Sequence, residues 1–251
     1  MLYKHTFVFL LSILFFIPAQ GQEVNGVITY NRKTDWISMM SKLPWITQED
    51  VDRDRLTWGK RSEESKGRNY ELYVDGMKSL YTYKEEESDG GYSWRKKENY
   101  CIIRDYKSKK ANDWVESLGK TYRIEEDMPK YRWKILNEIR EIEGYLCMKA
   151  ETKDTVKNQI IHAWFTDAIP VSGGPEGFGG LPGLILELDK NNGDAVVTAT
   201  EVKLDQDAVK LPVPKKMKGK EVSFAEFNQK LEKYIKGAMD SRENPFWRIR
   251  Y

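Results

Sequence analysis

The sequence has few of the residue types that most often bind metals, with two cysteines and two histidines among 251 residues. His5 lies in an N-terminal segment that we predict to be removed, which leaves His162 as the histidine of the mature chain. One histidine and two cysteines exclude a four-ligand Cys/His zinc site and every zinc peptidase motif that needs two histidines. We therefore predict neither a metal nor a cofactor.

A large excess of one charge is also missing, since 41 Lys and Arg stand against 39 Asp and Glu, a net charge of +2. This balance lacks the electrostatic footprint of a nucleic-acid-binding protein. Hydrophobic residues make up 40% of the chain and aromatic residues 12%, which excludes a disordered chain despite 32% of charged residues. The length suits a single domain, which we place at residues 22–251.

Long hydrophobic runs are confined to the N-terminus. After a short basic start, residues 6–18 are almost wholly apolar, which suits a signal-peptide core and falls short of the about 20 residues of a membrane span. Ala19-Gln20-Gly21 offers small residues for cleavage, so we predict a signal peptide over residues 1–21, with an uncleaved anchor as the alternative. The mature protein would have no membrane span and would reside in the periplasm, in the cell envelope or outside the cell.

Export changes the meaning of the two cysteines, because an oxidising compartment favours a bond between them. Cys101 and Cys147 both lie in apolar, strand-like segments. We predict a Cys101–Cys147 disulfide, which would stabilise the fold by roughly 4 kcal/mol in the chain-entropy model. Two buried free thiols are the alternative.

Alternating apolar and polar residues predict that the chain is mainly β. A first strand is expected at residues 26–30, and a meander of antiparallel strands at residues 70–166, with a turn at Asp89-Gly90-Gly91. Two later strands meet across Asn191-Asn192-Gly193-Asp194, where Asn-Gly is a strong hairpin signal. The predicted fold is a large antiparallel β-sheet or half-open barrel with minor α content.

Two stretches carry the apolar spacing of amphipathic helices. A short helix is expected over residues 36–43. A longer helix is expected near residues 223–240, where Ser223 and Glu226 form a capping box and one apolar stripe follows, which we expect to pack on the sheet. The polar residues 47–69 are expected to include a surface loop.

The most informative stretch is rich in glycine. Residues 173–179 read Gly-Gly-Pro-Glu-Gly-Phe-Gly, and the hexapeptide Gly180-Leu181-Pro182-Gly183-Leu184-Ile185 follows. Leu181-Pro182-Gly183-Leu184 suits a type II turn, with Pro at the second place and Gly at the third. The stretch lacks the lysine and the spacing of a phosphate-binding loop.

The hexapeptide resembles the signature of the GLPGLI family, exported proteins of the Bacteroidota of unknown function. Residues 26–30, Gly144-Tyr145-Leu146-Cys147 and Ala163-Trp164-Phe165-Thr166 also resemble the family pattern, so that the resemblance spans most of the mature chain. The second glycine of Gly173-Gly174 departs from the pattern. The resemblance implies export and leaves the activity open.

We expect Glu176 and Phe178, at the tip of the glycine-rich loop, to contact a partner. A long loop of this kind with an exposed aromatic residue stabilises a fold poorly, which suggests that it has a use. Pro182 and Gly183 would then only shape the turn. The alternative is a tight corner in which the loop packs closely against two strands.

No catalytic signature accompanies these features, since the sequence has no G-x-S-x-G motif and His162 is interpreted as a satisfied, half-buried side chain. We therefore predict that the chain is not an enzyme and binds an outer-membrane or periplasmic protein partner, or a hydrophobic ligand. The alternatives are a hydrolase that uses carboxylates or His162, and a structural component of an outer-membrane transport assembly. The alternating C-terminal residues 244–251 are expected to dock on the domain itself or on a partner.

Overall fold

A computed structural model gives the fold of residues 23–63, 67–84, 99–205 and 207–251. The predicted signal peptide and the turn at Asp89-Gly90-Gly91 lie outside the described residues. The strands of the described chain are β1 (Asn25–Thr34), β2 (Arg68–Asp75), β3 (Lys78–Tyr83), β4 (Tyr100–Asp105), β5 (Lys110–Ser117), β6 (Lys120–Asp127), β7 (Lys134–Ile142), β8 (Tyr145–Asp154), β9 (Gln159–Thr166), β10 (Leu184–Lys190), β11 (Ala195–Asp205) and β12 (Lys220–Glu221). The helices are α1 (Trp36–Ser41), α2 (Gln48–Glu63) and α3 (Phe224–Asp240), with short 3-10 turns η1 (Pro175–Gly177) and η2 (Pro245–Trp247).

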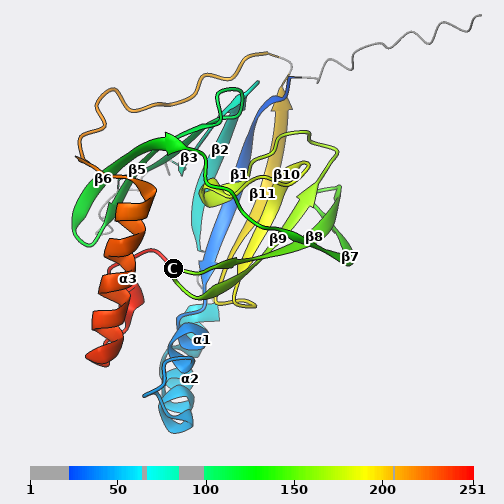
Figure 1. Cartoon of the computed structure of the whole chain (residues 1–251). Helices are drawn as coiled ribbons and strands as arrows, with labels where there is room; N and C mark the ends of the chain where they lie inside the picture. Colours follow the sequence, from blue (N-terminus) through cyan, green and yellow to red (C-terminus); the bar gives the residue numbers. More distant parts are fainter. Residues whose placement is uncertain (1–22, 64–66, 85–98, 206) are drawn as a thin grey trace, which may run out of the picture.

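The twelve described strands form one sheet in the order β12-β6-β5-β4-β3-β2-β1-β11-β10-β9-β8-β7. All neighbours are antiparallel except β12, which runs parallel to β6. The order is linear and ends at β12 and β7, so the sheet curves without closing (Figure 1). The predicted fold class, a large open sheet with minor α content, is confirmed.

β1 joins the two halves of the sheet, because it pairs with β2 on one side and with β11 on the other. Its side chains alternate between the two faces of the sheet, and Ile28 and Tyr30 point to the inner face, where both are fully buried. They pack in one large apolar cluster with residues of the other central strands, among them Leu72 and Leu188. This cluster is the core on which the functional site is built.

α1 and α2 lie beyond the end of β1, and α3 lies beside the β6 edge of the sheet (Figure 1). α1 begins after Asp35, whose carboxylate accepts from the Ser38 amide at 2.9 Å. In α3 both bonds of the predicted capping box are present, and the Phe227 ring packs edge-on against Tyr122 of β6 at 5.3 Å between centroids. The amphipathic C-terminal helix is thus confirmed.

α2 corrects the expectation of a surface loop over residues 47–69. The helix is mostly polar and exposed, so it lacks the apolar period by which helices are found in sequences. The sequence nevertheless contains the two residues of an N-terminal helix cap. The Thr47 hydroxyl accepts from the Asp50 amide at 3.2 Å, and the Asp50 carboxylate accepts from the Thr47 amide at 3.0 Å.

The predicted Cys101–Cys147 disulfide is absent, and both residues are buried free thiols. Cys101 lies in β4 and Cys147 in β8, with β3, β2, β1, β11, β10 and β9 between them in the sheet order, which no local signal reveals. Burial raises the pKa of Cys101 to about 12 and that of Cys147 to about 11, so that neither thiol is a ready nucleophile.

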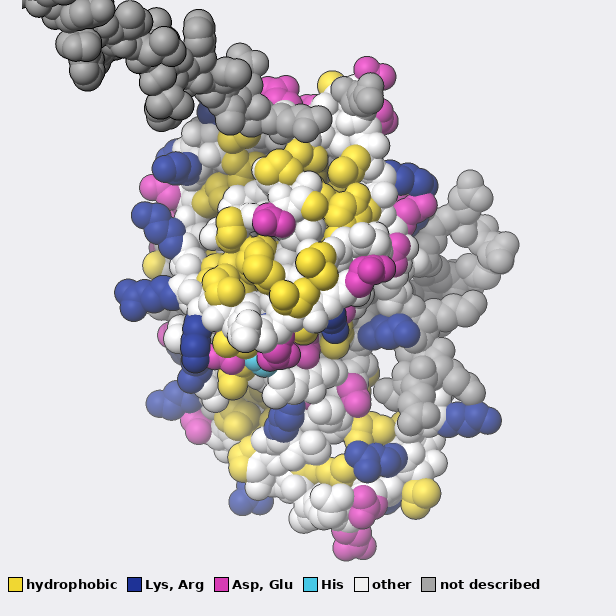
Figure 2. Space-filling model, turned by 90° about the vertical axis from the view of Figure 1, so that its right-hand side faces the viewer, with side chains coloured by type: hydrophobic (Ala, Val, Ile, Leu, Met, Phe, Trp, Pro, Cys, Tyr) yellow, Lys and Arg dark blue, Asp and Glu magenta, His cyan; other side chains and the backbone are white. Residues whose placement is uncertain are grey.

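The outer surface near β7 and β8 is apolar. Figure 2 shows hydrophobic side chains gathered on the face that carries these strands. Ile135, Ile139 and Leu146 are 51%, 60% and 66% exposed. Within the described residues, no helix combines the length and the apolar character that a membrane crossing requires.

Candidate functional site

The inner face of the curved sheet borders a cleft of about 1490 Å³. Strands β1–β6, the β8–β9 turn, η1, all three helices and the C-terminal tail contribute to its lining. Clefts for small ligands usually measure roughly 300–1,000 Å³, so this one has room for an oligomeric ligand.

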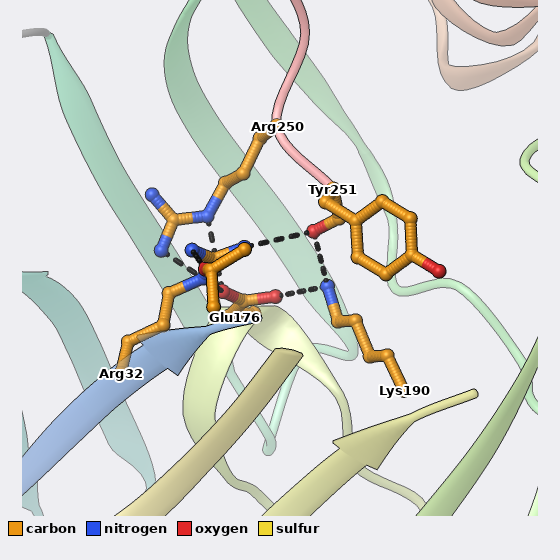
Figure 3. A network of polar contacts seen from close by, with 6 residues as sticks. Arg32, Glu176, Lys190, Arg250 and Tyr251 are labelled. Carbon is orange, nitrogen blue, oxygen red and sulfur yellow. Dashed lines mark hydrogen bonds and ion pairs between the residues drawn. The ribbon is translucent and has the colours of Figure 1, made fainter. Parts of the chain in front are cut away.

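Glu176 lies in this lining, where four segments distant in the sequence meet (Figure 3). Its side chain is 4% exposed, and its φ of +57° is rare for a residue other than glycine. One carboxylate oxygen accepts from Arg32 Nε at 3.1 Å and from Arg250 Nη2 at 2.9 Å. The other accepts from Lys190 Nζ at 2.5 Å. A single buried carboxylate is therefore shared by three cations.

The close approach of these charges shifts the pKa values of Glu176 and Lys190. Although burial alone would raise it, the charges of Lys190, Arg250 and Arg32 hold the pKa of Glu176 well below its usual range. Burial lowers the pKa of Lys190 to about 7 against the attraction of Glu176, with further lowering from Lys157 and Arg32. The inner end of the cleft thus keeps Glu176 ionised and disfavours a full set of charged cations.

The C-terminal tail completes this network. Figure 1 shows the C-terminus between α3 and the sheet. The main-chain oxygen of Tyr251 accepts from Lys190 Nζ at 2.8 Å and from Arg32 Nη2 at 3.2 Å. The Arg250 guanidinium lies over the rings of Tyr100 and Tyr70, at 4.1 and 4.7 Å from their centroids. The tail therefore docks on its own domain, one of the two expected outcomes.

A second buried ion pair, Arg104–Asp113, borders the same cleft. Two guanidinium nitrogens of Arg104 donate to the two Asp113 oxygens, in the bidentate geometry that suits a carboxylate. Burial raises the pKa of Asp113 despite the opposing charge of Arg104. Asp113 and Glu176 are thus two carboxylates with opposite pKa shifts, a pattern found in acid–base pairs, although cations hold both of them here.

The expectation of an exposed loop tip at Glu176 and Phe178 is wrong. Phe178 is half-buried and stacks on Tyr131 at 4.8 Å between centroids, and Trp133 Nε1 donates to the Gly179 carbonyl at 2.9 Å. The loop forms the tight corner named as the alternative. Glu176 and Phe178 still line the cleft, so that their predicted role in binding stays a prediction.

The hexapeptide Gly180-Leu181-Pro182-Gly183-Leu184-Ile185 makes a tighter turn than predicted. The Gly183 amide donates to the Leu181 carbonyl at 2.8 Å, which closes a three-residue turn around Pro182 instead of a type II turn. Gly183 has a φ of +153°, and a Cβ there would lie 2.0 Å from the Thr166 carbonyl oxygen. Close approach of two backbones, in addition to the positive φ, requires glycine at this place.

The residues that bind Glu176 were missed by sequence reasoning. Arg32, Lys190 and Arg250 lie at the end of β1, at the end of β10 and in the tail, so that only the fold brings them together. One signal was available for Lys190, because it continues the inward alternation of Leu188 and so places a lysine on the buried face.

In the described part of the chain the cleft lining has a positive excess, with nine Lys and Arg against four Asp and Glu. Five of the nine cations contact acidic or aromatic side chains around the cleft. The other four form no side-chain hydrogen bond or ion pair with any described residue: Lys130, Lys153, Lys157 and Arg248.

Three exposed tryptophans also line the cleft. Trp36 of α1, Trp58 of α2 and Trp247 of η2 are 44%, 53% and 72% exposed. Large aromatic side chains that stay open to solvent around a cleft are typical of binding surfaces.

His162 lies outside this cleft, on the face of β9 opposite to Ile161 and Ala163. It is 8% exposed, and its Nε2 lies 3.1 Å from Glu151 Oε2, which satisfies the ring as expected. In the described part of the chain no three His, Cys, Asp or Glu side chains are grouped so that they could hold a metal ion.

The fold and the site together define a class of protein: a mainly β chain whose open sheet borders a positively charged cleft lined by tryptophans. A family model described as "N-glycanase peptide, N-terminal domain" matches residues 101–225, just under half of the chain. Among curated proteins, none matches the sequence.

The solved structures that resemble the chain include PNGF-II in two crystal forms. In space group P21 the TM-score is 0.54 at 16% identity, over 83% of this chain and 33% of that chain. In space group C2 the TM-score is 0.53 at 18% identity, over 83% and 32%. The chain spans about a third of the length of these proteins, and the likeness concerns the fold.

The family match corrects the prediction that the chain is not an enzyme, because the matched model describes a domain of an N-glycanase. The matched model is also a different one from that of the GLPGLI family, so that membership of the GLPGLI family stays a prediction.

Proposed function

We propose that the chain binds the glycan part of glycoproteins in its cleft. The observation that carries the proposal is the set of three exposed indoles, Trp36, Trp58 and Trp247, around one cleft. The face of an indole packs well against the apolar face of a sugar ring, while the sugar hydroxyls keep polar partners or water.

Two further observations support a glycan as the ligand. The cleft of about 1490 Å³ has room for several sugar units. The family model that matches residues 101–225 takes its description from an N-glycanase, which connects this fold with glycans.

The proposal is tested by calorimetric titration of the protein with an N-linked glycopeptide. Replacing Trp36, Trp58 and Trp247 singly by Ala should weaken binding by about tenfold each, because buried aromatic contacts dominate such interfaces. The melting temperature should change little, since the three side chains are exposed.

Leu146→Ala is the matched control, because it removes an exposed apolar side chain outside the cleft. Failure of the unaltered protein to bind the glycopeptide, or equal binding by the triple tryptophan variant, would contradict the proposal. Mass spectrometry of the same mixture shows whether the glycopeptide is also cleaved.

We also propose that this binding takes place in the periplasm, in the cell envelope or outside the cell, because residues 1–21 have the pattern of a signal peptide. The intact mass of protein from the envelope fraction should correspond to a start at Gln22, and retention of Met1 would contradict export. An outer-membrane or periplasmic protein partner remains part of this proposal.

A further inference from the structure

The lining of the cleft is more positive than the chain as a whole. Among the described residues of the lining, nine cations and four anions leave an excess of five positive charges, whereas the whole chain has a net charge of +2. The walls of a cleft focus such a field inward and raise the local concentration of anions. The excess therefore indicates a ligand that is itself negative.

Lys157, in the turn between β8 and β9, is a cation of the cleft that such a ligand would reach. Its ammonium forms no hydrogen bond or ion pair with a described residue, although the charges of Asp154 and Glu176 act on it from a greater distance. Burial and the nearby cations lower its pKa. Lys157 is half-buried and lacks a direct ion-pair partner, which an anionic group of a ligand would supply.

The two neighbouring anions, Asp154 and Glu176, are already engaged. The Asp154 carboxylate accepts from the main-chain amides of Val156 and Lys157 at 2.9 and 3.1 Å. Glu176 accepts from Arg32, Lys190 and Arg250. Arg250 and Arg32 oppose the charge of Lys157. Lys130, Lys153 and Arg248 line the same cleft and add to the positive field that attracts an anion.

We propose that the ligand of the cleft is an acidic glycan and that Lys157 contacts its carboxylate or sulfate group. This inference rests on the proposed function and adds to it the class of glycan. The exposed tryptophans stack on sugar rings, and Lys157 selects the charged sugar.

The test measures binding by calorimetric titration at low and at physiological salt. It compares three glycopeptides of one branching pattern: one with terminal sialic acids, one with the sialic acids removed, and one with sulfated terminal sugars. Both acidic forms should bind about tenfold more tightly than the neutral one at low salt, and the difference should shrink as salt screens the charges. The two acidic arms distinguish a carboxylate from a sulfate as the preferred group.

Lys157→Gln should remove most of the preference for the acidic forms, keep binding of the neutral glycopeptide, and keep or slightly raise the melting temperature, because it removes a cation without a direct partner. Lys203→Gln is the matched control, because Lys203 is 70% exposed and lies outside the cleft. Equal losses in the two variants would overturn the role of Lys157.

Equal binding of acidic and neutral glycopeptides, with both lost in the tryptophan variants, would overturn this inference and leave the proposed function standing. Binding of none of the three glycopeptides would overturn both.

Discussion

Two carboxylates on opposite faces of the sheet differ in the number of cations that surround them. On the inner face, Glu176 is shared by Arg32, Lys190 and Arg250. On the outer face, Glu187 has one cation, Arg140, and a hydrogen bond from the Thr198 hydroxyl at 2.8 Å. The inner site holds surplus positive charge, whereas the outer one is balanced.

Other charged side chains near Glu187 on the outer face also have partners. Arg140 lies over the Trp164 ring at 4.0 Å, and Lys149 contacts Glu138 at 3.0 Å. His162 is satisfied by Glu151. Because folding gains nothing from surplus like charge in a confined space, the comparison supports the proposal that an anionic ligand binds on the inner side.

The largest expected effect is that of removing the inner carboxylate charge. Glu176→Gln should lower the free energy of unfolding by about 3–5 kcal/mol, because it leaves buried cations without their anion. Glu187→Gln should cost about 1–2 kcal/mol, since Arg140 is 40% exposed and water can solvate it. Urea unfolding of both variants measures the difference, and an equal or larger loss in Glu187→Gln would contradict the comparison.

The next effect concerns the loop that carries Glu176 into the cleft. Gly183→Ala should cost about 2–3 kcal/mol, because the new Cβ would lie 2.0 Å from the Thr166 carbonyl oxygen and the φ of +153° strains it further. Gly237→Ala is the control: its Cβ meets nothing within 4 Å, and alanine in α3 should stabilise by up to about 1 kcal/mol. If thermal unfolding showed that Gly183→Ala is more stable than Gly237→Ala, the loop would be able to adjust its backbone to the new Cβ, which would contradict this prediction.

The third effect is a pH dependence of stability. Lys190 has a pKa of about 7 in the folded protein, against about 10.4 when unfolded. Above pH 7 the unfolded chain therefore binds more protons, so that the free energy of unfolding should rise between pH 7 and 8.5, by at most about 1.4 kcal/mol per pH unit.

The buried thiols limit this window. Cys101 and Cys147 have raised pKa values in the folded protein, so that above about pH 8.5 ionisation in the unfolded chain opposes the gain. Lys190→Met should reduce the slope and leave the part that arises from the lowered pKa of Lys157, whereas Lys149→Met on the outer face should preserve the whole slope. Urea unfolding at pH 7.0, 7.75 and 8.5 tests this, and stability that falls over the range in the unaltered protein would disprove the assignment.

The smallest effect compares apolar side chains on the two faces. Phe178→Ala should cost about 1–2 kcal/mol, since it removes the stacking on Tyr131 at the edge of the cleft. Leu146→Ala, on the exposed outer surface, should change stability by less than about 0.5 kcal/mol. Thermal unfolding distinguishes the two, and a neutral Phe178→Ala would mean that the loop tip is held by its backbone alone.

Local signals were reliable where the structure depends on neighbours in the sequence. The capping box of Ser223 and Glu226 predicted the start of α3, and Asn191-Asn192-Gly193-Asp194 predicted the β10–β11 hairpin, where Asn191 and Asn192 take φ of +53° and +57°. Both signals act over a few residues, so that their geometry depends little on the rest of the chain.

Local signals failed where burial or distant pairing decides. The Gly-rich loop reads as an exposed tip, yet Glu176 is buried because cations from β1, β10 and the tail converge on it. The disulfide failed for the same reason, since the two cysteines lie in strands that the sheet order separates.

Neighbouring residues alone specify the alternating strands and the capped C-terminal helix, because period and caps are properties of short segments. The fold is what brings Glu176 to three cations, docks the tail beside them, places Gly183 against the Thr166 backbone and leaves Lys157 without a direct partner among the described residues. These outcomes depend on the order and curvature of the sheet, which arise from pairings between residues far apart in the chain.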